Sequence, residues 1–171
     1  MHRLMFAKYL STSTERKGFT LIELLVVVSI ISLLSSFVLF SVNQANARSR
    51  EAVRKSDLHQ LQSALENYYV DYNAYPNTGN EWWGISVNGG GREEYIPGLA
   101  PRYISELPLD PSRATSGWSG YLYRSDGRNF KLISHTIGPE DFPTPGQAFH
   151  DPIRPTTAIM VCSDEPACST W

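Results

Sequence analysis

Residues 16–28 of this chain, RKGFTLIELLVVV, open the apolar run that decides its fold. From Phe19 to Val42 the sequence has 24 residues and a single charged side chain, that of Glu23. A helix of this length extends over roughly 36 Å, at about 1.5 Å per residue, whereas the hydrocarbon core of a bilayer is about 30 Å thick. The run therefore predicts one membrane-spanning helix close to the beginning of the chain.

The residues before the apolar run are basic. Residues 1–18 have a net charge of +3, from Arg3, Lys8, Glu15, Arg16 and Lys17. A basic start followed by an apolar run is also typical of a secretory signal peptide. This run, however, is longer than a usual h-region and lacks a small-x-small cleavage site at its far end. An ordinary signal anchor is the remaining alternative.

The charges on the two sides of the run do not decide its orientation. Four Lys or Arg side chains precede it, and four follow it closely, at Arg48, Arg50, Arg54 and Lys55. Equal numbers give no preference under the positive-inside rule, but long segments translocate largely regardless of their charge. The size of the C-terminal part therefore favours its export.

Glu23 lies four residues into the apolar run. A carboxylate at this depth costs a few kcal/mol unless it stays hydrated or finds a partner. One interpretation places Glu23 near the interface, in contact with water. The other is a partner within an assembly, because a free amino terminus made at Phe19 would let a neighbouring subunit present its ammonium group to Glu23.

Residues 16–28 resemble the class III signal sequence of type IV prepilins and type II secretion pseudopilins. The resemblance implies that a membrane-embedded prepilin peptidase cleaves after Gly18 and that the new terminus, Phe19, is N-methylated. It matches Glu23 to the fifth mature residue of the family, which aids the registration of subunits during assembly. A start at Met5 would shorten the leader from 18 residues to 14.

The resemblance implies a structural subunit and not an enzyme. Such subunits assemble from the bacterial inner membrane into a homo-oligomeric type IV pilus or type II secretion pseudopilus, with the help of an assembly ATPase and a platform protein. The expected protein is a single-pass inner-membrane protein with its head outside the cytoplasm, and after assembly a periplasmic or extracellular filament. The motif is common to both filament systems and to major and minor subunits.

Beyond the membrane run the sequence still favours a helix. No proline or glycine occurs between Phe19 and Pro76, which permits one continuous helix of about 54 residues that ends near Tyr72. Apolar side chains at spacings of 3, 4, 3 and 4 share one face of this helix, namely Leu58, Leu61, Leu65, Tyr68 and Tyr72. The stripe is too short for a coiled coil, so we expect it to pack against the protein's own sheet.

The rest of the chain has the composition of short elements joined by loops. Ten of the 11 prolines and all but one of the 12 glycines occur from Asn77 onward. Residues 120–124 and 129–134 are predicted strands, and the Asp-Gly pair between them is a strong hairpin signal. Residues 157–162 are a third candidate strand, and a short helix is expected around residues 102–104.

Together these elements predict an α+β fold of the pilin type that the resemblance implies. A long N-terminal helix, membrane-spanning in its first half, carries a small antiparallel sheet on its C-terminal half. We divide the chain into a leader (1–18), the transmembrane and assembly half of the helix (19–42), its amphipathic half (43–75) and a globular head (76–171).

The two cysteines, Cys162 and Cys168, enclose a seven-residue loop. Export to an oxidising compartment favours a disulfide between them, with a pair of free thiols as the alternative. Under the resemblance, pilins commonly close a C-terminal loop with a disulfide, whereas major pseudopilins more often hold calcium there. The cysteine pair therefore favours a pilus subunit.

No cofactor is predicted, and calcium is left open without assigned ligands. Five aspartates in predicted loops offer oxygen atoms of the kind that calcium binds, namely Asp110, Asp126, Asp141, Asp151 and Asp164. Their spacing is not that of an EF-hand, and aspartates in loops are commonly turn residues.

The main alternative function is a signal-anchored, extracytoplasmic binding module that does not assemble. Its ligand patch would be Trp82 and Trp83, although a tryptophan of this kind more often covers a core. The sequence contains neither Gly-x-Ser-x-Gly nor His-Glu-x-x-His, and glycine-rich residues 88–91 lack the lysine of a phosphate-binding loop. No nucleic-acid partner is predicted, because a leader of +3 in a chain of −2 leaves −5 on residues 19–171.

Overall fold

A computed structural model of the protein describes residues 18–84, 94–112, 118–136 and 142–171. The leader before Gly18, the glycine-rich residues 88–91 and Asp141 lie outside the described residues. The chain divides into two compact units, Met1–Val42 and Asn43–Trp171. We describe each unit by itself.

One helix, α1 (Leu21–Tyr72), contributes to both units and is continuous over 52 residues. This confirms the long helix that the lack of proline and glycine predicts. The helix begins after Thr20 and ends where Asn73 enters the left-handed region, with φ 51°. The amide of Asn73 still donates to the carbonyl of Tyr69 at 2.7 Å, which closes the last turn.

In the described part of the first unit, large apolar side chains are exposed on all sides of the chain. Their exposed fractions run from 47% at Val26 to 86% at Phe19. Four serine hydroxyls donate to helix carbonyls three or four residues earlier, those of Ser29, Ser32, Ser36 and Ser41. Because these polar groups are satisfied within the helix, its surface suits the interior of a bilayer. The helix is long and apolar enough to span one.

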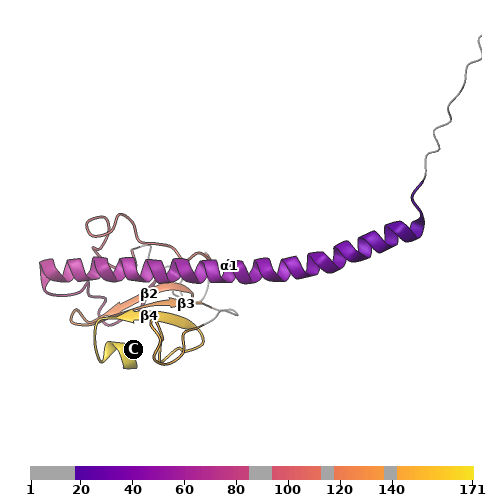
Figure 1. The fold of residues 1–171 in the computed structure, drawn as a ribbon. Helices are drawn as coiled ribbons and strands as arrows, with labels where there is room; N and C mark the ends of the chain where they lie inside the picture. Colours follow the sequence, from indigo (N-terminus) through magenta and orange to yellow (C-terminus); the bar gives the residue numbers. More distant parts are fainter. Residues whose placement is uncertain (1–17, 85–93, 113–117, 137–141) are drawn as a thin grey trace, which may run out of the picture. The chain divides into compact units, whose positions relative to one another are not determined.

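The second unit contains a four-stranded antiparallel sheet in the order β1-β2-β3-β4. Its strands are β1 (Trp83–Gly84), β2 (Gly120–Ser125), β3 (Phe130–His135) and β4 (Ala158–Cys162). The three longer strands confirm the predicted ones to within a residue, whereas the short edge strand β1 has no counterpart in the prediction. Figure 1 shows β2, β3 and β4 lying along the second half of α1.

The turn between β2 and β3 uses the predicted Asp-Gly pair, shifted by one position. The Asp126 amide donates to the Asn129 carbonyl at 3.4 Å, so the chain reverses at Gly127 and Arg128. Gly127 has φ 92°, a conformation that side chains other than glycine rarely adopt. Asp126 Oδ1 accepts the amides of Arg128 and Asn129, both at 2.8 Å, and thereby stabilises the turn from its first position.

The main core lies between α1 and the sheet, as the apolar stripe predicts for Leu58, Leu61 and Leu65, whereas Tyr68 is only partly buried and Tyr72 is 52% exposed. It contains Leu58, Leu61, Ala64 and Leu65 of α1 and Tyr121, Tyr123, Phe130, Leu132 and Ile159 of the sheet. Along β2, side chains alternate between the two faces, so Leu122 lies in a second cluster with Ile133 and Ala158. The sheet is therefore apolar on both faces.

Residues 94–112 form a series of turns, and the prediction of a short helix there is wrong. The amide of Tyr103 donates to the carbonyl of Leu99 at 3.0 Å, which makes one helical turn. Pro97 and Pro101 have no amide hydrogen, and a proline ring also clashes with the carbonyl four residues earlier. The turn is therefore not extended into a helix.

A four-residue helix, α2 (Ala167–Thr170), follows β4. A disulfide with an Sγ–Sγ distance of 2.01 Å joins Cys162, the last residue of β4, to Cys168 of α2. This confirms the predicted pairing over the free-thiol alternative. The bridge holds α2 at the end of β4.

Candidate assembly site

The start of α1 is closed by a capping box made of Thr20 and Glu23. Glu23 Oε2 accepts the amide of Thr20 at 2.8 Å and its hydroxyl at 2.6 Å. In return, the amide of Glu23 donates to Thr20 Oγ1 at 3.3 Å. The reciprocal bonds satisfy donors that have no partner inside the helix, and they hold the carboxylate beside its first turn.

The predicted processing residues directly precede this box. Gly18 and Phe19 are exposed and not helical. A Cβ atom built on Gly18 would meet nothing within 4 Å, so this unit imposes no requirement for glycine at the position. The structure thus leaves the bond between Gly18 and Phe19 accessible.

In the second unit, Arg54 and Asp110 form a buried ion pair that joins α1 to the loop before β2. Arg54 Nε lies 2.7 Å from Asp110 Oδ2, and Nη2 lies 3.1 Å from Oδ1, with side chains only 2% and 4% exposed. Ser112 adds its amide, at 2.8 Å, and its hydroxyl as donors. Burial by itself raises the pKa of Asp110, but these donors outweigh burial and hold the pKa below its ordinary value.

Arg54, one of the four basic residues that follow the apolar run, is only 1% exposed in the folded second unit. Its spacing contains a signal, since Arg54 precedes Leu58 by four residues and so continues the apolar stripe on the same face. A charge in such a stripe indicates a buried partner of opposite sign. Asp110 is 56 residues away, and no spacing rule identifies it.

A second carboxylate of this unit, Asp57 on α1, has the opposite pKa shift. Burial raises the pKa of Asp57, and the nearby charge of Asp110 raises it further. Tyr121 Oη donates to Asp57 Oδ2 at 2.5 Å and opposes these effects without reversing them. The two shifts differ because Asp110 has a guanidinium partner and Asp57 has a neutral hydroxyl.

A second buried ion pair fastens the C-terminal residues. Lys131 Nζ donates to Asp151 Oδ1 at 2.9 Å, and both side chains are 0% exposed. The same ammonium group donates to the carbonyls of Trp171 at 2.8 Å and Cys168 at 3.5 Å. Burial lowers the pKa of Lys131, and Asp151 opposes the shift. One ammonium group therefore connects β3, the loop before β4 and the segment that contains α2.

The aspartates considered as calcium ligands have protein partners wherever the structure describes them. Asp110 and Asp151 are in ion pairs, Asp126 accepts turn amides, and Asp164 Oδ1 accepts the amide of Glu165 at 2.8 Å. Among the described residues, no three His, Cys, Asp or Glu side chains gather as they would around a metal ion. The described geometry assigns no ligand set.

The two tryptophans considered as a ligand patch lie on different faces of the sheet. Trp83 packs against the main core, and Trp82 packs against the second cluster. The guanidinium groups of Arg124 and Arg154 lie 5.9 and 5.0 Å from the Trp82 ring centre. Both indoles thus cover core residues, as tryptophans commonly do.

Comparisons with known proteins agree with this architecture. Residues 14–39 match the model of the prokaryotic N-terminal methylation motif. Type II secretion system core protein G of Pectobacterium carotovorum subsp. carotovorum is 32% identical over 138 residues, which are 79% of this chain and 83% of that protein. The proteins of the same name from Pseudomonas aeruginosa and Vibrio cholerae are 31% and 33% identical, over 84% and 81% of their lengths and 72% of this chain. No solved structure matches the chain significantly.

The chain has a long helix whose first half is apolar and whose second half packs against an antiparallel sheet. This architecture, together with the N-terminal methylation motif, defines the class of pilin-like filament subunits. Within this class, the chain belongs to the family of type II secretion system core protein G, the major pseudopilins. It is a structural subunit, and the non-assembling binding module is not favoured. The preference for a pilus that the disulfide suggested is wrong, since these relatives belong to the secretion system.

Proposed function

We propose that the apolar half of α1 stores the subunit in the bacterial inner membrane, where a prepilin peptidase cleaves after Gly18. The new terminus, Phe19, is then N-methylated. Two observations support this processing: the methylation motif covers residues 14–39, and the bond after Gly18 lies in an exposed stretch before α1. The fold itself does not require glycine at position 18. Glycine is therefore needed there for recognition by the peptidase.

Glu23 sets the axial register of the filament by pairing with the Phe19 ammonium group of a neighbouring copy. The observation that carries this role is the capping box, which holds the carboxylate beside the first helical turn. Both bonds from Thr20 use Oε2, and in the described part of the chain no donor is bonded to Oε1. Oε1 is therefore the oxygen that would accept from the ammonium group of the neighbour.

The head lies outside the cytoplasm, and the subunit is passed from the membrane into a homo-oligomeric pseudopilus by the assembly ATPase and the platform protein. The disulfide supports this orientation, because such bonds persist in oxidising compartments and are rare in the cytosol. Partner copies replace lipid around the apolar side chains of α1 as the filament forms.

The head folds stably without bound calcium. In support, the aspartates that offer oxygen atoms are occupied by Arg54, Lys131 and backbone amides. The disulfide and the Lys131–Asp151 pair supply the connections between segments that a bound ion would otherwise make.

The processing step is tested by the intact mass of the protein from native membranes, measured with and without reduction. We expect the loss of residues 1–18, the gain of one methyl group, and two further hydrogens on reduction. A full-length mass would exclude the proposed processing and leave an anchored, unassembled protein.

The register role is tested with Glu23→Ala. Processing should be unchanged while filament yield falls strongly, because the ammonium group of the neighbour loses its acceptor. Glu23→Asp serves as the control that keeps the charge, and normal filaments from the alanine variant would contradict the role.

A further inference from the structure

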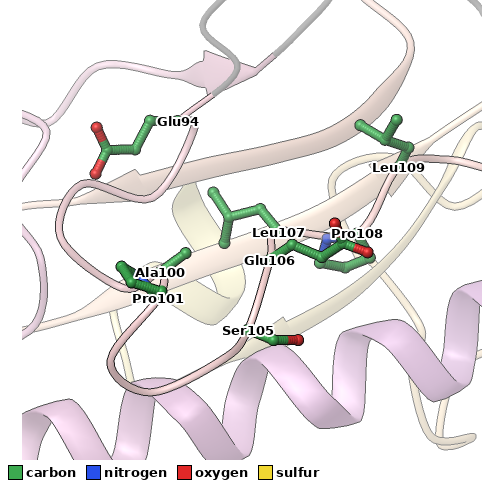
Figure 2. Close-up of a pocket in the computed structure, with 8 residues that line it drawn as sticks. All are labelled: Glu94, Ala100, Pro101, Ser105, Glu106, Leu107, Pro108 and Leu109. Atoms are coloured by element: carbon green, nitrogen blue, oxygen red, sulfur yellow. The ribbon is translucent and has the colours of Figure 1, made fainter.

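A groove of about 890 Å³ runs along the loop between Glu94 and Leu109 of the head (Figure 2). Its apolar lining residues include Ala100, Pro101, Leu107 and Pro108. Leu109 at one end is 61% exposed, and among the described large apolar side chains of this unit only Val70 is more exposed. Apolar residues bordered by polar ones are the arrangement found in protein interfaces.

Two carboxylates border this groove, those of Glu94 and Glu106, and both residues are exposed. Glu94 Oε1 accepts the amide of Gly98 at 2.8 Å, which fixes its position. Figure 2 shows Glu94 near the start of the loop and Glu106 beside Leu107 and Pro108. The matching partner therefore carries apolar side chains with a cation beside them.

The loop that forms the groove is fastened to α1 at two places. Toward its C-terminal end, Asp110 is held by Arg54. In its middle, Arg102 Nη2 donates to Asp71 at 2.9 Å, and Tyr103 Oη donates to the same carboxylate at 2.6 Å. The groove is thus preformed, so a partner bears little of the entropy cost of ordering it.

The same unit has a surface of the matching chemistry on α1. Arg48 and Ala52 are exposed and four residues apart, hence on one helical face. Beside them, Val53 is 44% exposed. A small apolar patch with a cation about one turn away is the complement of an apolar groove bordered by carboxylates.

We propose that the groove binds the Arg48–Val53 surface of a second copy of this chain. The proposal rests on the proposed function, because only an assembling subunit meets its own copies at high local concentration. It adds a contact between a head and the α1 helix of a neighbouring copy to the contact at Glu23. Charge complementarity favours this occupant, since Glu94 and Glu106 border the groove, whereas residues 48–53 contain two arginines and one carboxylate, that of Glu51, which is paired with Lys55.

Groove and helix surface are different patches of one chain, so the contact is heterologous and leaves a free groove and a free helix surface at the two ends. Each copy offers its groove to one neighbour and its helix surface to another, so repetition of the contact produces an open chain of subunits and not a closed dimer.

The test is cross-linking of the full chain in native membranes that contain the assembly machinery. A chain with both Val53→Cys and Leu109→Cys is treated with a short bismaleimide, while each single variant is the control. The native cysteines form a disulfide and do not react. The double variant should give a ladder of multimers, and neither single variant should.

Filaments sheared from the same cells are imaged in parallel, which separates this proposal from the proposed function. Filaments without a ladder would overturn the contact and leave the function intact. Dimers from Leu109→Cys alone would overturn it too, because they require two grooves to face each other. A chain that forms no filament would overturn both.

Charge exchange gives a second test of the same contact. Glu106→Arg and Arg48→Glu should each reduce the multimers about tenfold, because each places like charges together. Combining them should restore the ladder, whereas Glu81→Arg, an exposed carboxylate outside the groove, should leave it unchanged. Equal losses in the single and combined variants would overturn the pairing.

Discussion

Removing the guanidinium group of Arg54 leaves the Asp110 carboxylate buried without its cation. We expect Arg54→Met to destabilise the head by about 3–5 kcal/mol, the usual effect of breaking a buried pair from one side. The Arg54→Met/Asp110→Asn double variant should lose less stability than the sum of the losses in the two single variants, because the unpaired buried charge is then removed. All four tryptophans lie in residues 43–171, so near-UV circular dichroism during urea unfolding reports this unit. Strictly additive losses would contradict the coupling.

The lowered pKa of Asp110 also predicts that the second unit loses stability in acid. The folded-state pKa of Asp110 lies below the ordinary value, so its contribution is complete above the unfolded pKa of about 3.9. That contribution is lost as the pH falls through the folded pKa. Thermal midpoints measured between pH 6 and pH 2 should drop for the natural chain and drop less for Asp110→Asn. Parallel curves would show that the carboxylate is not the source.

The contribution of Asp57 to stability changes with pH in the opposite direction. Its folded pKa is raised, so its contribution is largest below the unfolded pKa and falls as the pH rises through the folded value. Asp57→Asn keeps an oxygen acceptor for Tyr121 and removes the charge. It should therefore match or exceed the natural chain in stability at pH 7, and the difference should vanish near pH 3. A clear loss at pH 7 would contradict the assignment.

At the scale of elements, the disulfide and Lys131 act on the same segment. The bridge holds α2, and the carbonyls of Cys168 and Trp171 are acceptors for the buried ammonium group. Cys162→Ser/Cys168→Ser should therefore increase hydrogen exchange in α2 and in the loop around Asp151, while α1 next to the core stays protected. Lys131→Met, in a chain that keeps both cysteines, should increase hydrogen exchange in the same loop, because Asp151 loses its main cation. Exchange confined to residues 162–168 would show that the two features are independent.

Elements also differ in how far local sequence decides them. The β2–β3 hairpin follows from Asp126 and Gly127, because turn chemistry acts within four residues. The loop at 94–112 does not follow in this way, since its prolines exclude a helix and leave many turn paths open. Its actual path depends on Asp110, which a residue on another element holds.

At the scale of the whole molecule, the head is proposed to close through protein groups alone. Treatment with a strong chelator should then leave the thermal midpoint of the second unit unchanged, and added calcium should not raise it. The Lys131→Met variant is the matched control, because it shows the shift that follows when one of these protein connections is lost. A midpoint that falls with the chelator and recovers with calcium would reveal a metal site and overturn this part of the proposed function.

The sequence by itself determined the features that rest on short-range patterns. The apolar run from Phe19 to Val42, the uninterrupted helix, its apolar stripe and the filament-subunit class are all local in the chain, and the structure and the relatives confirm them. Only the tertiary structure decided the partners of Arg54 and Lys131, 56 and 20 residues away, and the groove lined by the loop from Glu94 to Leu109 was equally hidden. The physical reason is that a charged side chain is expected in water unless a specific opposite charge offsets its desolvation. That partner comes from the way distant segments pack, which spacing along the chain does not encode.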